Sequence, residues 1–416
     1  MWLFLLVVIV GTVYLSSMQG ITCCNSGSSF ALVRAIVEKG KLEISEFIKY
    51  TKFLDYAKVK NKYYTDRPPG LAFVAVPFHF FRLNVTLVAA ISGILSSVFV
   101  YLITLSIINS AVISFFTALI FAFCTLNWRY STIFIIHPLS TLLILISVFG
   151  ILNSWPVLLI GLILGISTIV EYTNFVFLFG IILFEIIYGN FVFVLTIIIG
   201  YLLGIVPLLI YNKTCFGSPF TTSYKYSAHF KWSNSPKTTF VTPMLKGIRG
   251  LLFYMKKKRG IKLPGGILIA SPVLIFGIIG YIFMPLKTLI LFLCLTIPLF
   301  LLISKHKTYW GGGAGDYRYI SSIIPYITIP IGLTIKNLFF IWPIILILAL
   351  ISLLMMAMKM IALTVKLEDI KNIAQKDSKK QRIKDVLRLK NTGKISQLVL
   401  KGIFIRKVNL ENKIYN

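Results

Sequence analysis

The sequence predicts an all-α integral membrane protein with about eleven transmembrane helices. Only 13% of its 416 residues are charged, whereas soluble domains carry about 25%. Apolar runs of about 20 residues, the length that spans a bilayer as a helix, recur along most of the chain. We therefore expect a multi-pass protein of the cell membrane, with residues 1–361 as one transmembrane domain and residues 362–416 as a basic tail.

The predicted spans follow the apolar runs in order. Residues 1–17 lack the positively charged start and the small-residue cleavage site of a signal peptide, so they are predicted to be the first span. The ten further spans are predicted at 84–108, 110–127, 138–153, 155–171, 173–189, 191–211, 265–285, 287–304, 320–337 and 339–361. The apolar run 70–81 is too short to cross, and we expect an interfacial or half-inserted helix there.

Three polar segments interrupt the apolar runs. They are a first large loop at 20–83, a second large loop at 212–265 and a third loop at 305–319. Alternating the chain across the membrane from the first span places all three on one face, together with His137 and Glu171. Residues 45–58 of the first loop carry aromatic and apolar anchors, so this segment is predicted to form amphipathic helices at the interface.

The charge of the chain favours anionic partners. The formal net charge is +29, and the second loop contains eleven Lys and Arg residues and no acidic residue. Basic loops attract lipid head groups, phosphates or acidic substrates. No nucleic-acid-binding module is recognisable, so nucleic acid is not an expected partner. In the tail, a basic amphipathic helix is predicted at 367–389 and a short helix or strand at 395–408.

Acidic residues are scarce outside the tail, and this singles out a few of them for chemistry. Asp66 and Arg67 precede two prolines, which fix the backbone and hold both charges in a defined direction at the membrane surface. Glu171 ends an apolar run, and an ionisable residue at membrane depth is a functional hypothesis by default. The alternatives are an interfacial carboxylate or an ion pair for Glu171, and a structural hydrogen bond for the lone His137.

A glycine-rich segment at 309–318 suits an anion. Its glycines precede Asp316 and Arg318, and flexible glycines beside an acid and a guanidinium allow close approach to a phosphate. The segment lacks the Gly-Lys-Ser/Thr ending of a nucleotide P-loop, which excludes that type of site. The five cysteines show no zinc-binding spacing.

Taken in order, these motifs resemble the GT-C superfamily of membrane glycosyltransferases. The branch is the protein mannosyltransferase and aminoarabinose-transferase-like group, which takes sugar from a polyprenyl-phosphate lipid. Residues 64–69, Tyr-Thr-Asp-Arg-Pro-Pro, are similar to that group's Y-x-[ED]-K-P-P motif, and residues 25–32 are similar to its N-D-G-S-x-x-A-L segment. Further parallels lie at 136–138, 171–172, 211–219 and 310–319, so the resemblance covers residues 1 to about 335.

The resemblance implies sugar transfer from a polyprenyl-phosphate donor to a lipid, glycan or protein acceptor. Its implied donor- and phosphate-binding residues are Arg67, Arg318, Tyr64, Asp316 and Trp310. Its implied acceptor or divalent-metal residues are His137, Glu171 and Tyr172.

The implied catalytic residues are Asp66 and the position of Ser26. The family's general base is the aspartate of N-D-G-S, and this chain has Ser26 there. Either Asp66 or another acid accepts the proton, or the chain is a non-catalytic homologue. A transporter or flippase for an anionic lipid or solute is the remaining alternative, although the repeated halves typical of transporters are not evident.

Overall fold

The computed structural model describes residues 1–258 and 261–364. The segments predicted at 367–389 and 395–408 lie outside the described residues. Within the described chain, strands occur only in two antiparallel hairpins: β1 (Tyr56–Val59) with β2 (Lys62–Thr65), and β3 (Met255–Lys258) with β4 (Ile261–Pro264). All other regular structure there is helical, which confirms the predicted all-α class.

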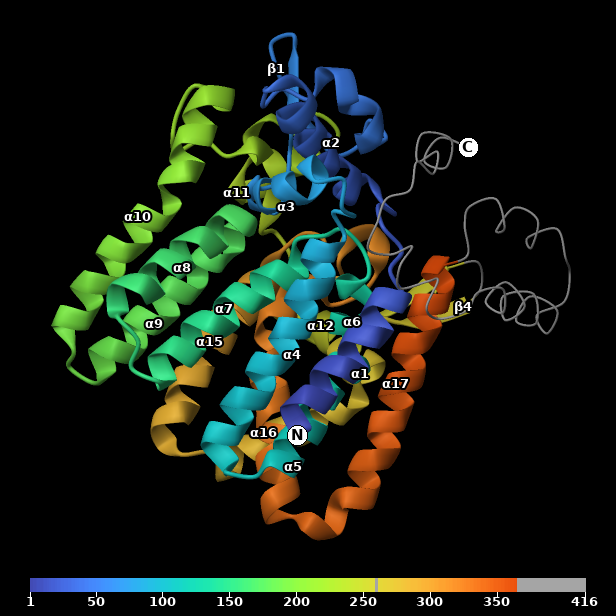
Figure 1. Ribbon diagram of the computed structural model, residues 1–416, viewed down its shortest axis with the longest axis vertical. Helices are drawn as coiled ribbons and strands as arrows, with labels where there is room; N and C mark the ends of the chain where they lie inside the picture. The colour runs from blue at the N-terminus through green and yellow to red at the C-terminus, as the bar shows by residue number, and fades with distance from the viewer. Residues whose placement is uncertain (259–260, 365–416) are drawn as a thin grey trace, which may run out of the picture.

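A layer of apolar helices forms the body of the protein (Figure 1). The helices are α1 (Trp2–Ser16), α4 (Leu87–Ile108), α5 (Ala111–Cys124), α6 (Leu126–Ser131), α7 (His137–Leu152), α8 (Val157–Val170), α9 (Phe175–Ile187), α10 (Phe191–Phe216), α13 (Ile267–Ala270), α14 (Ile275–Gly280), α15 (Leu286–Lys305), α16 (Ile324–Asn337) and α17 (Trp342–Thr364). Short 3-10 turns join some of them: η2 (Tyr172–Asn174), η5 (Pro272–Leu274), η6 (Tyr281–Phe283), η8 (Arg318–Ile323) and η9 (Phe339–Ile341).

The predicted count of eleven spanning helices is not borne out. Among the described residues, five helical segments are long and apolar enough to cross a membrane: Leu87–Ile108, Phe191–Phe216, Leu286–Lys305, Arg318–Asn337 and Phe339–Met360. These five helices fit a membrane protein. The other apolar helices have only 10–17 residues, because polar residues divide the apolar runs. Ser110, for example, caps α5 by accepting a hydrogen bond from the Ile113 amide, and Ser271 separates α13 from η5.

The first large loop folds over one end of the helices (Figure 1). It contains α2 (Cys24–Lys39), the 3-10 helix η1 (Ser45–Thr51), the β1–β2 hairpin and α3 (Gly70–Phe80). The expectation of amphipathic helices over 45–58 is therefore wrong in its second half, where β1 begins at Tyr56. Aromatic and β-branched residues fit a pleated strand better than a helix, and they gather in this hairpin. The short helix predicted at 70–81 is present as α3.

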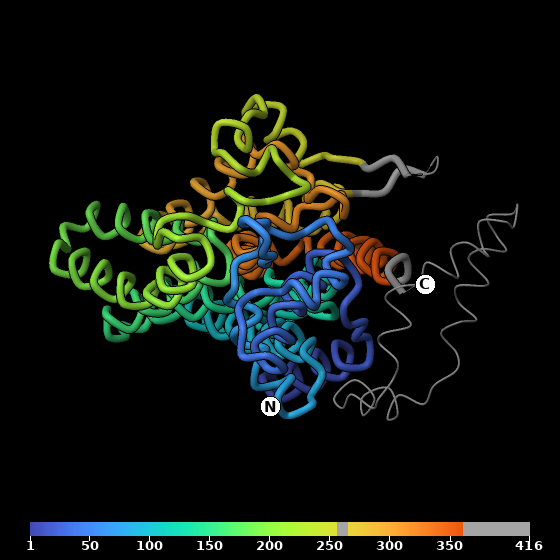
Figure 2. Tube along the Cα trace, turned by 90° about the horizontal axis from the view of Figure 1, so that it is seen from above, coloured from blue at the N-terminus to red at the C-terminus, as the bar shows by residue number. Residues whose placement is uncertain are grey.

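The second and third loops join the first at the same end. The second loop contains η3 (Ser223–Tyr226), η4 (Lys231–Asn234), α11 (Pro236–Thr239), α12 (Met244–Phe253) and the β3–β4 hairpin, and the third contains η7 (Gly312–Ala314). The Ala228 amide donates to the Tyr56 carbonyl at 3.0 Å, and the Lys307 amide donates to the Thr239 carbonyl at 2.7 Å. Seen from above, the first and second loops meet over the helices (Figure 2).

Glycines allow close packing of α8 on α10. Gly161 and Gly165 of α8 lie against Gly200 and Gly204 of α10, and at each of the four a Cβ atom would collide with a backbone carbonyl of the partner helix. Pairs of small residues spaced four apart are the usual means by which membrane helices bring their backbones together. This contact positions α8, whose C-terminal end leads into Glu171.

We expect Gly204→Ala to loosen this helix pair. The new methyl group meets the Leu162 carbonyl and cannot be accommodated without backbone movement, which costs about 1–3 kcal/mol. Gly11→Ala is the matched control, because a Cβ atom there meets only Ile94 Cδ1 at an ordinary 3.8 Å. Unfolding of both variants in detergent measures the difference, and equal stabilities would contradict this account of the packing.

Candidate functional site

A large cavity lies where the three loops meet the ends of the helices. Its volume is about 2020 Å³, roughly twice the upper end of the ~300–1,000 Å³ that is typical of small-molecule sites. Its wall includes Asp66 and Arg67 from the first loop, Glu171 after α8, and Arg318 at the start of η8. The fold thus brings together charged residues that are far apart in the sequence.

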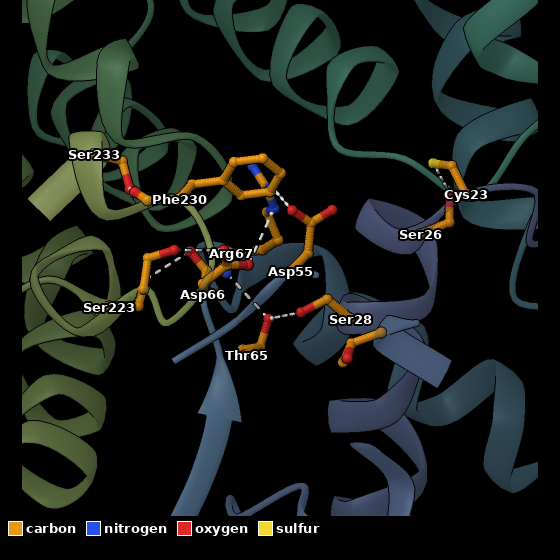
Figure 3. Close-up of polar contacts among 12 residues, drawn as sticks. Cys23, Ser26, Ser28, Asp55, Thr65, Asp66, Arg67, Ser223, Phe230 and Ser233 are labelled. Carbon is orange, nitrogen blue, oxygen red and sulfur yellow. Dashed lines mark hydrogen bonds and ion pairs between the residues drawn. The ribbon is translucent and has the colours of Figure 1, made fainter. Parts of the chain in front are cut away.

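Arg67 lies between two buried carboxylates (Figure 3). Its Nη2 donates a hydrogen bond to Asp55 Oδ1, and its Nε lies 3.3 Å from Asp66 Oδ1. Asp55 and Asp66 are 2% and 1% exposed, respectively. One guanidinium cannot compensate two carboxylates fully, so this acid cluster (Asp55, Arg67 and Asp66) has an excess negative charge when both acids are ionised.

The environment of Asp66 favours proton transfer near neutral pH. Burial raises the pKa of Asp66 to about 7, with Arg67 opposing this shift and Asp55 adding to it. Its Oδ2 accepts a hydrogen bond from Ser227 at 3.3 Å, and its carbonyl accepts one from Ser223 at 2.9 Å. A carboxylate that titrates near the working pH is a suitable general base.

Gly70 fixes the acid cluster relative to the helices. Two prolines follow Arg67, and α3 begins at Gly70, where a Cβ atom would lie 2.7 Å from the backbone of Ile169 and Val170. Only glycine permits this approach. The start of α3 therefore touches the end of α8, immediately before Glu171, so both acids open onto the same cavity.

A group of cations lines another part of the wall. This cation group consists of Arg129 from α6, Arg318, and Lys359 from α17. Within the described part of the chain, Lys359 Nζ and the Nε atoms of both arginines have no hydrogen-bond partner. Groups of this kind, buried and only partly satisfied, are suited to bind an anion.

Asp316 lies outside the cavity wall and contacts the cation group. It is fully buried and accepts hydrogen bonds from Arg129 Nη1 at 2.9 Å and from the Tyr130 hydroxyl at 2.6 Å. Burial alone would raise the pKa of Asp316, but Arg129, Lys359 and Arg318 hold it below its usual value. One ionised carboxylate faces three cations, so the group keeps a net positive charge.

Tyr319 lies beside the cation group. Its hydroxyl lies 3.5 Å from Arg318 Nη2, and its ring lies 5.1 Å from the Arg318 guanidinium. The same tyrosine is also close enough to contribute to the electrostatic environment of Arg67. The acid cluster and the cation group therefore face one space without forming ion pairs with each other.

His137 and Glu171 form a pair on the cavity wall. His137 Nδ1 lies 3.6 Å from Glu171 Oε2, and the neighbouring Tyr172 hydroxyl lies 3.2 Å from Ser223 Oγ. Among the described residues, no three His, Cys, Asp or Glu side chains are grouped so that they could hold a metal ion. The expected divalent-metal site therefore has two adjacent protein ligands at most in this part of the chain.

Four of the predicted site residues are not in the cavity wall. Asp316 lies behind the cations, Tyr64 packs against the Phe216 ring, and Trp310 stacks on Tyr254. Ser26 is fully buried and contacts Cys23 Sγ at 3.4 Å. Figure 3 shows it pointing toward Cys23 and away from the acid cluster. Ser26 is therefore outside the cavity wall, although its contact Cys23 lines the cavity, and its catalytic role stays a prediction.

Sequence reasoning missed Asp55, Arg129 and Lys359. In the β1–β2 hairpin Tyr56 pairs with Thr65, which places the preceding Asp55 beside the following Asp66. Recognising the hairpin would have revealed this pair. Lys359 was detectable as an ionisable residue within an apolar helix.

Comparison of the chain with family models, curated proteins and solved structures finds no match.

We expect Asp66→Asn to stabilise the protein at pH 8 and to have little effect at pH 4. The pKa of Asp66 is raised from 3.8 to about 7 on folding, so its contribution to stability is complete below pH 3.8 and is lost as the pH rises through 7. Asparagine has no ionisable carboxyl group, so the variant does not lose stability in this way as the pH rises. Arg67 and Asp55 then remain as a pair without net charge.

Melting temperatures at the two pH values measure this effect. Glu46→Gln, which removes an exposed pair with Lys39, is the control and should change stability little at either pH. A lower melting temperature for Asp66→Asn at pH 8 would show that Arg67 requires both carboxylates.

Proposed function

We propose that the protein is a membrane glycosyltransferase of GT-C-like architecture, which moves a sugar from a polyprenyl-phosphate donor to an acceptor hydroxyl. The observation that carries this proposal is the content of the cavity. Its wall combines three cations, a buried carboxylate with a pKa near 7 and apolar helix surface. The cations would bind the donor phosphate, the apolar surface would hold the prenyl chain, and the carboxylate would accept the acceptor's proton.

The cation group suits the donor phosphate. Arg318 is the central ligand, because it has no carboxylate partner within the described chain and guanidinium groups bind phosphate oxygens through two donors. Arg67, by contrast, already contacts two carboxylates. We therefore assign the phosphate to Arg318, Arg129 and Lys359, and we assign Arg67 to holding Asp66.

Apolar residues of the same cavity suit the prenyl chain. Phe179 of α9 and Met358 of α17 line the cavity, and their side chains are 59% and 51% exposed. The cavity thus offers accessible apolar side chains from two helices. A lipid-linked phosphate can place its charged group beside Arg318 while its chain remains in an apolar environment.

Asp66 suits the role of general base. The acceptor oxygen attacks the anomeric carbon of the sugar, and the bond from this carbon to the phosphate oxygen breaks. The polyprenyl phosphate leaves with the electron pair, stabilised by the cation group. The acceptor's proton passes to the Asp66 carboxylate, a contribution typically worth about 10²–10⁴-fold in rate.

The direct test is turnover of labelled donors by the full chain in lipid nanodiscs. A panel of polyprenyl-phosphate-linked hexoses, pentoses and aminosugars is incubated with membrane extract as the acceptor source, and release of polyprenyl phosphate is followed. Release from one donor class supports the proposal. Binding of donors without release supports the non-catalytic alternative, and absence of binding excludes the donor site.

We expect Arg318→Gln to weaken binding of polyprenyl phosphate by roughly 10- to 100-fold, the usual value of one or two charge-assisted hydrogen bonds. Arg318→Lys should recover only part of this loss, since lysine cannot bind two oxygens in one plane. Arg82→Gln, an exposed arginine outside the cavity wall, is the matched control. Calorimetric titration measures all three, and a larger loss for Arg67→Gln than for Arg318→Gln would contradict the assignment.

We also expect turnover to rise with pH through an ionisation near 7, the pKa of Asp66, and then to level off. Asp66→Asn should lower turnover by about 10²–10⁴-fold while donor affinity stays within a few-fold of wild type. Rates and donor affinities measured from pH 5 to pH 9 separate the two effects. If affinity and turnover fell together, Asp66 would organise the site and the base would be another acid.

A further inference from the structure

Aromatic side chains form a continuous row along the cavity wall. The Tyr319 and His306 ring centroids are 5.2 Å apart, those of His306 and Trp232 are 5.5 Å apart, and those of Trp232 and Phe230 are 6.2 Å apart. All four rings line the cavity. They come from the second and third loops, so the fold of both loops is required to build this aromatic row.

One end of the aromatic row is the phosphate site. Arg318 lies over the Tyr319 ring, at 5.1 Å from its centroid, and the other end reaches Phe230 in the second loop. If the phosphate of the donor contacts Arg318, the aromatic row would begin near the donor's sugar and extend away from it toward Phe230. The cavity, at about 2020 Å³, has room for a second molecule beside the donor head group.

Hydrogen bonds hold two members of the row. His306 Nδ1 accepts one from the Thr308 amide at 3.1 Å, which orients the ring, and the Trp232 backbone carbonyl accepts one from Thr238 Oγ1 at 2.7 Å. Burial lowers the pKa of His306 to about 4, so its ring is neutral at physiological pH. The rings are thus uncharged, with Arg318 over Tyr319 and Lys307 Nζ 5.9 Å from the Trp232 ring centroid.

Polar groups accompany the rings. Ser233, Asn234, Thr239 and Thr308 line the same part of the cavity. A carbohydrate has apolar C–H faces that stack on aromatic rings and hydroxyl groups that hydrogen-bond to such side chains. Polar groups interleaved with rings suit a carbohydrate better than an acyl chain, which uses apolar contacts alone, and an extended peptide would need a row of unpaired backbone groups.

We propose that the row Tyr319, His306, Trp232 and Phe230 binds carbohydrate, and that the acceptor is an oligosaccharide. Successive rings are separated by about the length of one sugar unit, so several units can contact the row at once. The acceptor role rests on the glycosyltransferase function proposed above, whereas the binding of carbohydrate by the row does not.

The test is calorimetric binding of oligosaccharides to the full chain in nanodiscs. The probes are mono- to hexasaccharides of glucose, mannose, galactose and N-acetylglucosamine, with polyprenyl phosphate titrated separately. We expect the affinity for at least one series to rise from mono- to trisaccharide. Trp232→Ala should lower that affinity roughly tenfold or more, and Trp232→Phe should retain most of it, because stacking depends on the ring. Neither variant should change the affinity for polyprenyl phosphate.

Two further variants keep the test decisive. Trp155→Ala is the matched control, since Trp155 packs on Phe149 away from the cavity wall. Gly313→Leu adds a side chain at a cavity-lining position where a Cβ atom has no neighbour within 4 Å. The leucine side chain should occupy part of the cavity without disturbing the fold and should weaken oligosaccharide binding.

The outcomes separate the two proposals. Failure of every oligosaccharide to bind, or equal affinity in wild type, Trp232→Ala and Gly313→Leu, would overturn the carbohydrate site. Preferential binding of serine- and threonine-containing peptides would overturn it as well. If oligosaccharides bound and polyprenyl phosphate did not, the row would stand as a carbohydrate site and the donor assignment would fail.

Discussion

The site depends on the burial of one arginine between two aspartates. Asp55, Arg67 and Asp66 come from the two ends of the β1–β2 hairpin, and burial of charge without compensation is costly. The second loop contributes two hydrogen bonds: Ser227 donates to the Asp66 carboxylate and Ser223 donates to the Asp66 backbone carbonyl. The two large loops therefore close over the cluster together, and burial, with Asp55 adding to it, raises the pKa of Asp66.

Among the described residues Arg318 forms no ion pair with the acid cluster, and the proposed two-substrate chemistry would depend on this separation. If Arg318 formed an ion pair with Asp55 or Asp66, neither a phosphate nor an acceptor hydroxyl would find a free partner. The Tyr319 side chain lies against Arg318, with its hydroxyl 3.5 Å from Arg318 Nη2. Asp316, placed behind Arg129 rather than in the wall, orients the cations without neutralising all of them.

Much of the helical architecture could be predicted from the sequence, because apolar runs and polar loops report burial directly. The paired Asp66 and Arg67 were also visible, since the prolines after them are a local signal. The partners of these residues were not. Asp55 depends on the register of a hairpin, and Arg129 and Lys359 meet Arg318 only through the packing of α6 and α17. Such contacts are tertiary, and no local pattern specifies them.

The number of spanning helices was wrong for a related reason. Hydropathy measures composition, but a new helix begins where a capping residue such as Ser110 accepts a hydrogen bond from one of its first amides, so long apolar runs yielded shorter helices. The surroundings of Ser26 are tertiary too: it lies in α2, next to Gly27, which packs against the Tyr50 backbone so closely that a Cβ atom would collide with the carbonyl. A motif match does not specify such contacts.

Gly70 explains how chemistry in the loops is coupled to the helices below. Because α3 begins against the last residues of α8, any shift of α8 is transmitted to Asp66 together with Glu171. The α8 helix in turn is held by its glycine contact with α10, which continues into the second loop at Phe216. The same two elements thus position the acid cluster from below and carry the second loop, which supplies Trp232 and closes over Asp66. The proposed donor site against the helices and the proposed acceptor site against the loops would therefore move together.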